Sequence, residues 1–430
     1  MPATRRPRAV PRTRPLATTD APGALASGLT PNATPARAPS APADLDRARR
    51  LRRAAVRRVL LAVHLWVGLV SGAVLSVVGV TGSLYVFAPE ITAALNPELF
   101  AARPAAGGSG APLPVLDLAQ RVAAATGRGP DAVESVQWPQ RGRATFQFKL
   151  FGDDSWWFVD PFTGRVLGRD VDRPSTQAAE WLLHVHTSLA LGVWGERIVG
   201  ASALLLALVL VSTGLWLWWP RTAARRRTAF RIDLAAPPAR RLLDLHSVPG
   251  VYAAAPLAVL ALTGAVWSFP DVGRRLVDGI TGSAPLPADF WEAQSSAPAG
   301  RRPLTLAQVL ARTEGEFPGY HRRNLWMTGD STGALYVSWI RTPEIAAGGE
   351  YRPMLFLDRH TGATLVRYDP ERASRGTRLL NVWFPPVHYG EVGGLPTRVA
   401  VFAAGFVPLA LTLTGVQMWR RRRTRAARGA

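Results

Sequence analysis

The sequence predicts an all-α membrane protein: a bundle of four transmembrane helices made of two repeated helix pairs, with two small α+β domains outside the membrane. Three observations predict this class. Four apolar runs are long enough to cross a bilayer, arginine clusters flank them, and one pattern of His, Gly and Thr-Gly positions occurs twice. The composition agrees, because 48% of the 430 residues are hydrophobic and only 19% are charged.

Residues 1–48 precede the first apolar run and are rich in Pro, Ala and Arg without apolar periodicity. Such a segment buries too little apolar surface to fold, so we expect a disordered cytoplasmic tail. The net charge of +21 comes from arginine, since Lys149 is the only lysine. Because these arginines abut apolar runs, they indicate membrane flanks, and no nucleic-acid partner is expected.

Four transmembrane helices are predicted, over residues 59–87, 198–219, 242–269 and 399–419. Each run reaches the roughly 20 residues that a helix needs to cross the hydrocarbon core. Arginines crowd the segment before the first run, the loop 220–241 and the tail 420–430. The positive-inside rule therefore places this loop and both termini in the cytoplasm.

The two long connections then lie outside the membrane, and each is predicted to contain a small folded domain. These domains are residues 98–180 and 284–375. Alternating apolar and polar residues at 144–150 and 334–339 predict strands in both. The segments Asp160-Pro-Phe-Thr-Gly and Asp358-Arg-His-Thr-Gly are predicted to form a turn between two strands in each domain.

An internal repeat relates the first half of the chain, residues 59–219, to the second half, residues 242–419. In each half a histidine precedes a glycine by four positions and a Thr-Gly dipeptide by seventeen: His64, Gly68 and Thr81-Gly82, then His246, Gly250 and Thr263-Gly264. A second histidine and a second Thr-Gly follow in each half: His186 and Thr213-Gly214, then His388 and Thr414-Gly415.

The spacing places these histidines at two depths. Seventeen helical residues rise about 25 Å, so His64 and His246 are expected near the inner surface. His186 and His388 precede the second and fourth spans and are expected near the outer surface. An ionisable group within a span is costly and points to function. We therefore expect two pairs, His64 with His246 and His186 with His388.

Each pair could hold a metal ion or a haem. A zinc site needs three or four protein ligands, whereas two imidazoles from facing helices suit the axial positions of a b-type haem. The chain contains no cysteine, which excludes iron–sulfur clusters and c-type attachment. The expected cofactor is haem b, two per chain, with the iron held by the four histidines.

Arginines at the matching depths are candidates to bind the haem propionates: Arg57, Arg58 and Arg241 inside, and Arg197 and Arg398 outside. The alternative is that they extend to lipid headgroups. Gly68 and Gly250 could let a flat macrocycle approach the backbone closely. The alternative is that they serve close helix packing, as small residues in membrane helices usually do, and the same holds for Gly82 and Gly264.

The remaining histidines and one aspartate also have roles to assign from the sequence. His184 is the alternative to His186 as the outer ligand, while His321 and His360 are expected at the surface. Asp244 could orient an imidazole or cap the third helix.

The quoted motifs resemble the PepSY-associated transmembrane family, also described as iron-regulated membrane proteins, which includes ferric-siderophore reductases. The matching segments are His64-Leu-Trp-Val-Gly-Leu with Thr81-Gly82, Leu183-His-Val-His-Thr-Ser-Leu-Ala-Leu-Gly, Leu245-His246 with Pro249-Gly250 and Thr263-Gly264, and Val387-His-Tyr-Gly with Thr414-Gly415. The Asp160 and Asp358 turns look like the ends of PepSY domains. The family's histidines correspond to His64, His186, His246 and His388.

The resemblance implies a bacterial plasma-membrane protein with haem b and extracytoplasmic PepSY domains. It would carry electrons from a cytoplasmic donor to a ferric siderophore or another ferric chelate, in iron acquisition. Two other readings stay open. The chain could be a PepSY sensor, interaction or regulatory protein, or a small transporter, since Pro256 and Pro408 interrupt apolar helices as in transporters.

Overall fold

The computed structural model describes residues 41–102, 110–140, 142–284, 290, 293–296, 301–330, 332–341 and 350–428. The chain divides into two units, residues 1–54 and 55–430. Helix α1 (Ala41–Val86) begins in the first unit and continues into the second. Residues 41–48 are therefore helical rather than part of a disordered tail, and residues 1–40 of that predicted tail lie outside the described residues.

Four apolar helical segments among the described residues are long enough to cross a membrane, as predicted. They are Arg47–Val86, Gly192–Trp218, Pro238–Ser268 and Leu395–Arg425. The first lies in α1. The others are α6 (Gly192–Leu204), the π-helical segment η2 (Leu205–Leu210) and α7 (Val211–Trp218), then α9 (Pro238–Ser268), then α14 (Leu395–Gly405) with α15 (Val407–Arg428).

Large apolar side chains project outward from all four segments. Val70 is 70% exposed and Leu208 63%, and Leu262 and Leu413 are also exposed. Contiguous exposed apolar surface of this kind is rare on soluble monomers and is expected where helices face lipid.

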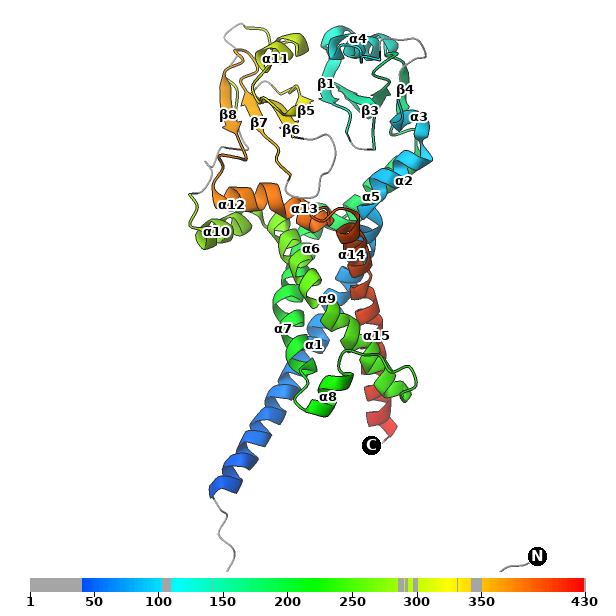
Figure 1. The fold of residues 1–430 in the computed structure, drawn as a ribbon, viewed down its shortest axis with the longest axis vertical. Coiled ribbons are helices and arrows are strands. Elements are labelled where there is room, and N and C mark those ends of the chain that lie inside the picture. Colours follow the sequence, from blue (N-terminus) through cyan, green and yellow to red (C-terminus); the bar gives the residue numbers. More distant parts are fainter. Residues whose placement is uncertain are drawn as a thin grey trace, which may run out of the picture. The chain divides into compact units, whose positions relative to one another are not determined.

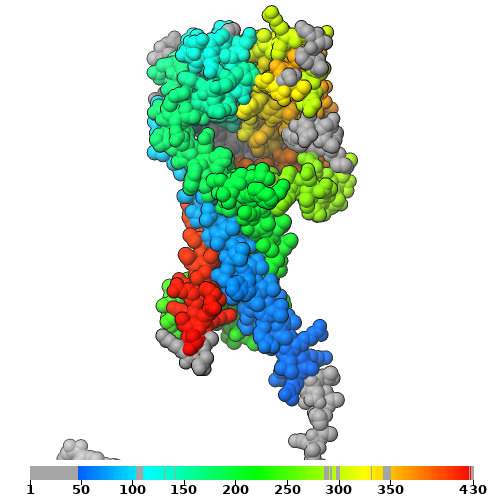
Figure 2. Space-filling view, turned by 180° about the vertical axis from the view of Figure 1, so that it is seen from behind, coloured from blue at the N-terminus to red at the C-terminus, as the bar shows by residue number. Residues whose placement is uncertain are grey.

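Small residues allow the helices to pack closely. A Cβ added to Gly79 of α1 would overlap the carbonyl oxygen of Gly405 in α14, and one added to Gly72 would meet Thr412 at 2.6 Å. The hydroxyl of Ser83 also donates a hydrogen bond to the carbonyl of Phe402 at 2.7 Å. Figure 2 shows α1, in blue, beside the red helix at the end of the chain, as these contacts require.

Shorter helices lie at both ends of the bundle. The arginine-rich loop contains α8 (Ala223–Thr228). At the opposite end are α2 (Ala88–Leu95), α3 (Pro97–Phe100), α5 (Pro174–Ser188), α10 (Pro270–Thr281), α12 (Arg375–Arg378), the π-helical segment η3 (Leu379–Trp383) and α13 (Phe384–Tyr389). Helix α5 carries His186 and helix α13 carries His388, the two predicted outer histidines.

The described strands of the two long connections form one antiparallel sheet in the order β4-β3-β2-β1-β5-β6-β7-β8 (Figure 1). The first connection supplies α4 (Val115–Ala125), β1 (Val133–Gln137), β2 (Phe146–Leu150), β3 (Asp153–Val159) and β4 (Val166–Arg169). The second supplies α11 (Leu306–Arg312), β5 (His321–Trp326), β6 (Leu335–Ile340), β7 (Met354–Leu357) and β8 (Thr364–Tyr368).

The prediction of two separate external domains is therefore wrong in one respect. Strand β1 pairs with β5, with Val136 opposite Leu325, so the two four-stranded parts share an edge. They also share one apolar core, which contains Leu118 and Val122 of α4 and Val309 of α11, all fully buried. Burial of apolar area across this junction stabilises the two parts together.

The predicted turns are present. The Asp160 carboxylate accepts hydrogen bonds from the amides of Phe162 and Thr163 between β3 and β4. The Asp358 carboxylate accepts from His360 and Thr361 in the same way between β7 and β8. An aspartate that binds the backbone ahead of it fixes a tight turn, which explains the spacing of both Asp-x-x-Thr-Gly segments.

Candidate functional site: two histidine pairs

Two pairs of histidines lie at opposite ends of the bundle. We name His64 of α1 and His246 of α9 the loop-side pair, because they lie near the arginine-rich loop, and His186 of α5 and His388 of α13 the sheet-side pair. The ring centroids are 6.3 Å apart in the loop-side pair, with 79° between the ring planes. In the sheet-side pair the values are 6.2 Å and 65°.

The hydrogen bonds of the loop-side pair identify the ring nitrogen that carries the proton. Nδ1 of His64 lies 2.8 Å from the Thr213 hydroxyl, and that hydroxyl donates its hydrogen to the carbonyl of Val209 at 2.6 Å. A hydroxyl has one hydrogen, so towards His64 it can only accept. Nδ1 is therefore the protonated nitrogen, and Nε2 keeps its lone pair.

His246 has the same arrangement. Its Nδ1 lies 2.9 Å from the hydroxyl of Thr414, which donates to the carbonyl of Ala410 at 2.7 Å. The imidazole is again the donor through Nδ1. Both rings of the loop-side pair therefore leave Nε2 available as a metal ligand.

Both rings of the sheet-side pair are also protonated at Nδ1, but the two acceptors are of different kinds. Nδ1 of His388 lies 2.8 Å from the hydroxyl of Thr263, which donates to the carbonyl of Val259 at 2.8 Å. Nδ1 of His186 lies 2.8 Å from the carbonyl of Val78, which can only accept. Among the described residues none forms a hydrogen bond with Nε2 of any of these four histidines.

The glycines of the Thr-Gly motifs lie against the imidazoles. A Cβ on Gly82 would overlap the ring of His186; one on Gly214 would lie 3.2 Å from Cε1 of His64, and one on Gly264 3.3 Å from Cε1 of His388. Gly415 faces His246 at 3.7 Å. Gly82 and Gly264 each leave room for a histidine ring of a neighbouring helix, α5 and α13 respectively.

The two pairs are well separated along the bundle. His64 and Gly82 lie on the same helix, eighteen residues apart, which corresponds to about 27 Å of helix rise. Gly82 contacts His186, so this rise also separates the two pairs. This separation is close to the thickness of a hydrocarbon core, about 30 Å.

A cavity of about 390 Å³ lies at the loop-side pair and is lined by His64 and His246. Gly68 and Gly250 also line it, and a Cβ added to them would meet Leu210 at 3.6 Å and Leu411 at 3.5 Å, which are ordinary contact distances. Its volume falls within the range typical of ligand sites, roughly 300–1,000 Å³. Four arginines from four helices line the cavity: Arg57, Arg225, Arg240 and Arg422.

The structure places only one of the five predicted propionate-binding arginines at the loop-side cavity. Arg57 lines the loop-side cavity, but Arg58 and Arg241 are not among its lining residues. Arg197 is exposed and stacks on Trp194 at 5.2 Å. Arg398 is buried and already bound, because its guanidinium donates to Glu90 at 2.9 Å and to the carbonyl of Val86 at 2.6 Å. Sequence reasoning missed the other three arginines of the cavity, whose positions depend on the fold of the loop.

The structure also shows where the other histidines and Asp244 lie. His184 is exposed on α5, whereas His186 faces His388. His321 is exposed, but His360 is buried, contrary to expectation, with Nδ1 3.1 Å from the carbonyl of Arg301. Asp244 neither caps nor orients an imidazole.

Asp244 instead forms an ion pair with Arg240 at 2.8 Å within α9, seven residues into a helix that begins at Pro238. Its other carboxylate oxygen, Oδ2, is buried and has no hydrogen-bond partner in the described part of the chain. One aromatic neighbour of the sheet-side pair was not predicted: the ring of Trp267 lies 4.8 Å from that of His388.

The donor set fits a group that takes two nitrogen ligands. In the described part of the chain no three His, Cys, Asp or Glu side chains are grouped as a metal site would require. Two imidazoles on opposite sides of one metal, with bonds of about 2 Å, have their centroids about 6 Å apart. Both pairs match this separation, and a b-type haem is bound by two such ligands without covalent attachment.

These features define a polytopic membrane protein whose bundle holds a pair of histidines at each of two levels. The chain belongs to the PepSY-associated transmembrane family, because the model for the PepSY-associated TM region matches residues 61–422, as the motifs predicted. The matched range includes all four paired histidines and the whole sheet. No curated protein matches the chain significantly.

Proposed function

We propose that this protein is a haem b oxidoreductase of the bacterial plasma membrane, carrying electrons from a cytoplasmic donor to an extracytoplasmic ferric chelate such as a ferric siderophore. The observation that supports this is the pairing of four imidazoles, each with Nδ1 engaged and Nε2 available. The proposed role is in iron acquisition. A haem at each pair would supply reversible one-electron chemistry at iron, one electron for each ferric ion reduced.

The protein's own residues would bind and orient these groups. The Thr213 and Thr414 hydroxyls fix the rings of the loop-side pair, while the Val78 carbonyl and the Thr263 hydroxyl fix those of the sheet-side pair. Arg57, Arg225, Arg240 and Arg422 line the loop-side cavity and would bind propionate carboxylates there.

The distribution of arginines along the bundle supports the proposed direction of electron transfer. Arginines concentrate at the loop-side end, in the loop that contains α8 and in the last turns of α15. The positive-inside rule assigns this end to the cytoplasm and the sheet to the outside. Reduction outside would release iron, because hard oxygen ligands hold ferric iron much better than ferrous iron.

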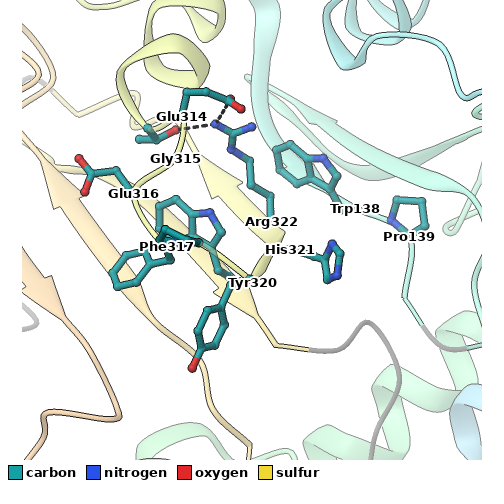
Figure 3. A pocket seen from close by; sticks show the side chains of 13 residues that line it. Trp138, Pro139, Glu314, Gly315, Glu316, Phe317, Tyr320, His321 and Arg322 are labelled. Atoms are coloured by element: carbon teal, nitrogen blue, oxygen red, sulfur yellow. Dashed lines mark hydrogen bonds and ion pairs between the residues drawn. The ribbon is translucent and has the colours of Figure 1, made fainter.

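A cleft in the sheet favours a second function, that of a sensor or interaction protein. The cleft has a volume of about 560 Å³ and lies where β1 meets β5, with Trp138, Tyr320 and His321 among its lining residues. Figure 3 shows Trp138 and Arg322 facing it, with Arg322 bound to Glu314. Mixed aromatic and polar lining of this kind can bind a peptide or a small molecule.

An absorption spectrum separates these functions. The purified full-length protein should show a dithionite-reduced b-type spectrum, with about two haems per chain by pyridine haemochrome assay. His64→Ala and His388→Ala should each lose about half of it, whereas His184→Ala should retain all of it. A colourless, correctly inserted protein would overturn the reductase proposal and favour the sensor.

A further inference from the structure

Three arginines lie together near the junction between the sheet and the bundle. Arg143 follows β1, Arg323 lies on β5, and Arg352 precedes β7. We name these three residues the arginine cluster. The carboxylate of Glu350 forms ion pairs with both Arg323 and Arg352, and its backbone amide donates to the carbonyl of Val382 in η3 at 2.8 Å. The cluster is thereby connected to η3, the segment directly before α13, which carries His388.

Among the described residues the charge of the cluster is not balanced. Glu350 is shared by two arginines, while the described partners of Arg143 are neutral acceptors: the carbonyl of Trp138 and the side chains of Gln137 and Gln147. Burial and the charge of Arg323 lower the pKa of Arg143 to about 10, at which it is still a cation at neutral pH. Buried cations normally have a counter-charge, so this excess requires an explanation.

A second carboxyl, that of Glu391, lies within electrostatic range of Arg323. Burial raises its pKa, the charge of Glu350 raises it further, and Arg398 and Arg323 lower it. Within the described residues the three arginines thus face two carboxyls, Glu350 and Glu391, and the arginine cluster keeps a net positive charge even when both are ionised.

Unpartnered polar atoms surround the cluster. Within the described residues, Nε of all three arginines is buried without a hydrogen-bond partner. The same is true of Oδ1 of Asn324 and Oγ of Ser338, which lie opposite each other on β5 and β6. Buried polar groups are nearly always satisfied, so donors and acceptors gathered in this way indicate a binding site. The cluster is also reachable from solvent, because the Arg323 side chain is 21% exposed and that of Arg352 is 33% exposed.

Aromatic residues connect the cluster to the sheet-side pair. The ring of Trp267 contacts that of His388 and stacks on that of Tyr389, with centroids 5.9 Å apart. Tyr389 lies within electrostatic range of Glu350 and Arg352 and is in contact with the ring that contacts His388.

We infer that the arginine cluster binds the carboxylates of an anionic ferric chelate, so that the substrate class is a polycarboxylate chelate of iron. This inference rests on the proposed function. Planar guanidinium groups bind carboxylates through paired hydrogen bonds, and a carboxylate can approach the solvent-exposed parts of Arg323 and Arg352. A positively charged chelate would be repelled from the same position.

The test uses gallium(III) citrate, an anionic chelate that cannot be reduced, titrated into the full-length protein in detergent by calorimetry. Binding should weaken about tenfold or more in Arg143→Gln, Arg323→Gln and Arg352→Gln, since each removes a charged hydrogen-bond donor. Arg169→Gln is the matched control, because Arg169 lies on the same sheet and pairs with Asp172. It should bind as the parent does.

Glu350→Gln is the sharper variant. It removes the carboxylate that Arg323 and Arg352 share, so citrate binding should become tighter, whereas a purely structural ion-pair network would give weaker or no binding. Because this variant keeps all three arginines, it also tests the inference if an arginine variant does not fold.

Because gallium accepts no electron, the titration tests the anion site independently of electron transfer. In membranes, the KM for ferric citrate should rise in the arginine variants, whereas reduction of a cationic ferric hydroxamate should become faster, because part of the charge that repels it is removed. Equal gallium citrate binding in all variants would overturn the inference. So would a changed haem spectrum in the arginine variants, since the arginines would then bind haem carboxylates.

Discussion

His64 and Thr213 are joined by a 2.8 Å hydrogen bond in which the imidazole is the donor, because the threonine hydroxyl already donates to the carbonyl of Val209. The hydroxyl thus fixes both the tautomer and the ring orientation of a residue 149 positions away. Such partners of a metal-binding histidine commonly affect metal affinity as strongly as the geometry of the ligand itself.

Thr213→Val keeps the shape of the side chain and removes the acceptor. We expect haem affinity at the loop-side pair to fall about 10–100-fold, because the freed Nδ1–H loses its partner and the ring can rotate. Haem titration of the apoprotein measures this. Ser212→Ala is the control, since the Ser212 hydroxyl bonds only to carbonyls of its own helix. An equal loss in both variants would contradict the assignment.

Gly82→Ala should remove the sheet-side site. The added Cβ would overlap the His186 ring, which must then move, whereas the Cβ in Gly415→Ala would meet His246 at an ordinary contact distance of 3.7 Å. We therefore expect Gly82→Ala to lose about one of two haems and Gly415→Ala to retain both. Haem content per chain is the measurement, and full haem content in Gly82→Ala would show that the ring is not held at this glycine.

Arg398→Ala should destabilise the protein without changing its haem content. The buried guanidinium is bound by Glu90 and the Val86 carbonyl, and its removal takes these hydrogen bonds away. Because Glu90 is half exposed, we expect a loss of about 2 kcal/mol rather than the larger cost of a fully buried pair. Thermal unfolding in detergent tests this, with the exposed Arg197→Ala as control. A loss of haem in Arg398→Ala would return it to the propionate role.

Acid should destabilise the β7–β8 turn through Asp358. Burial acts to raise the pKa of this carboxyl, but hydrogen bonds from Ser296, Thr361 and His360 outweigh it and hold the pKa well below its ordinary value of 3.8. A depressed pKa contributes stability that is fully present above pH 3.8 and is lost as the pH falls further.

Asp358→Asn should therefore lower stability at neutral pH and remove this part of the acid dependence. Tryptophan fluorescence during unfolding, compared between pH 5 and pH 2.5, measures it. Asp154→Asn, at a fully exposed carboxylate, is the control. An unchanged acid dependence in Asp358→Asn would contradict the turn's role.

The histidine pairing could be predicted from the sequence because depth follows from helix rise, and rise is a local property of the chain. The role of the Thr-Gly motifs could not. Their spacing was visible, but whether Gly82 faces a helix or an imidazole depends on how α5 folds back against α1. Thr213 and His64 likewise meet only when separate helices associate.

The arginines were the least predictable residues. Arg225 and Arg422 reach the loop-side cavity from a short helix in a loop and from the end of α15, and neither position follows from apolar periodicity. The junction of β1 and β5 was missed for a related reason. Alternating residues predict strands, but the pairing of Val136 with Leu325 joins segments that are far apart in the sequence.

Each histidine is oriented by its own half of the chain but is paired with a histidine of the other half. His64 and His186 bind Thr213 and Val78 of the first half, and His246 and His388 bind Thr414 and Thr263 of the second. The rotamer entropy of each imidazole is therefore lost within a helical hairpin. When the two halves associate, only the distance between already ordered rings has to be set, which lowers the entropic cost of assembling both sites.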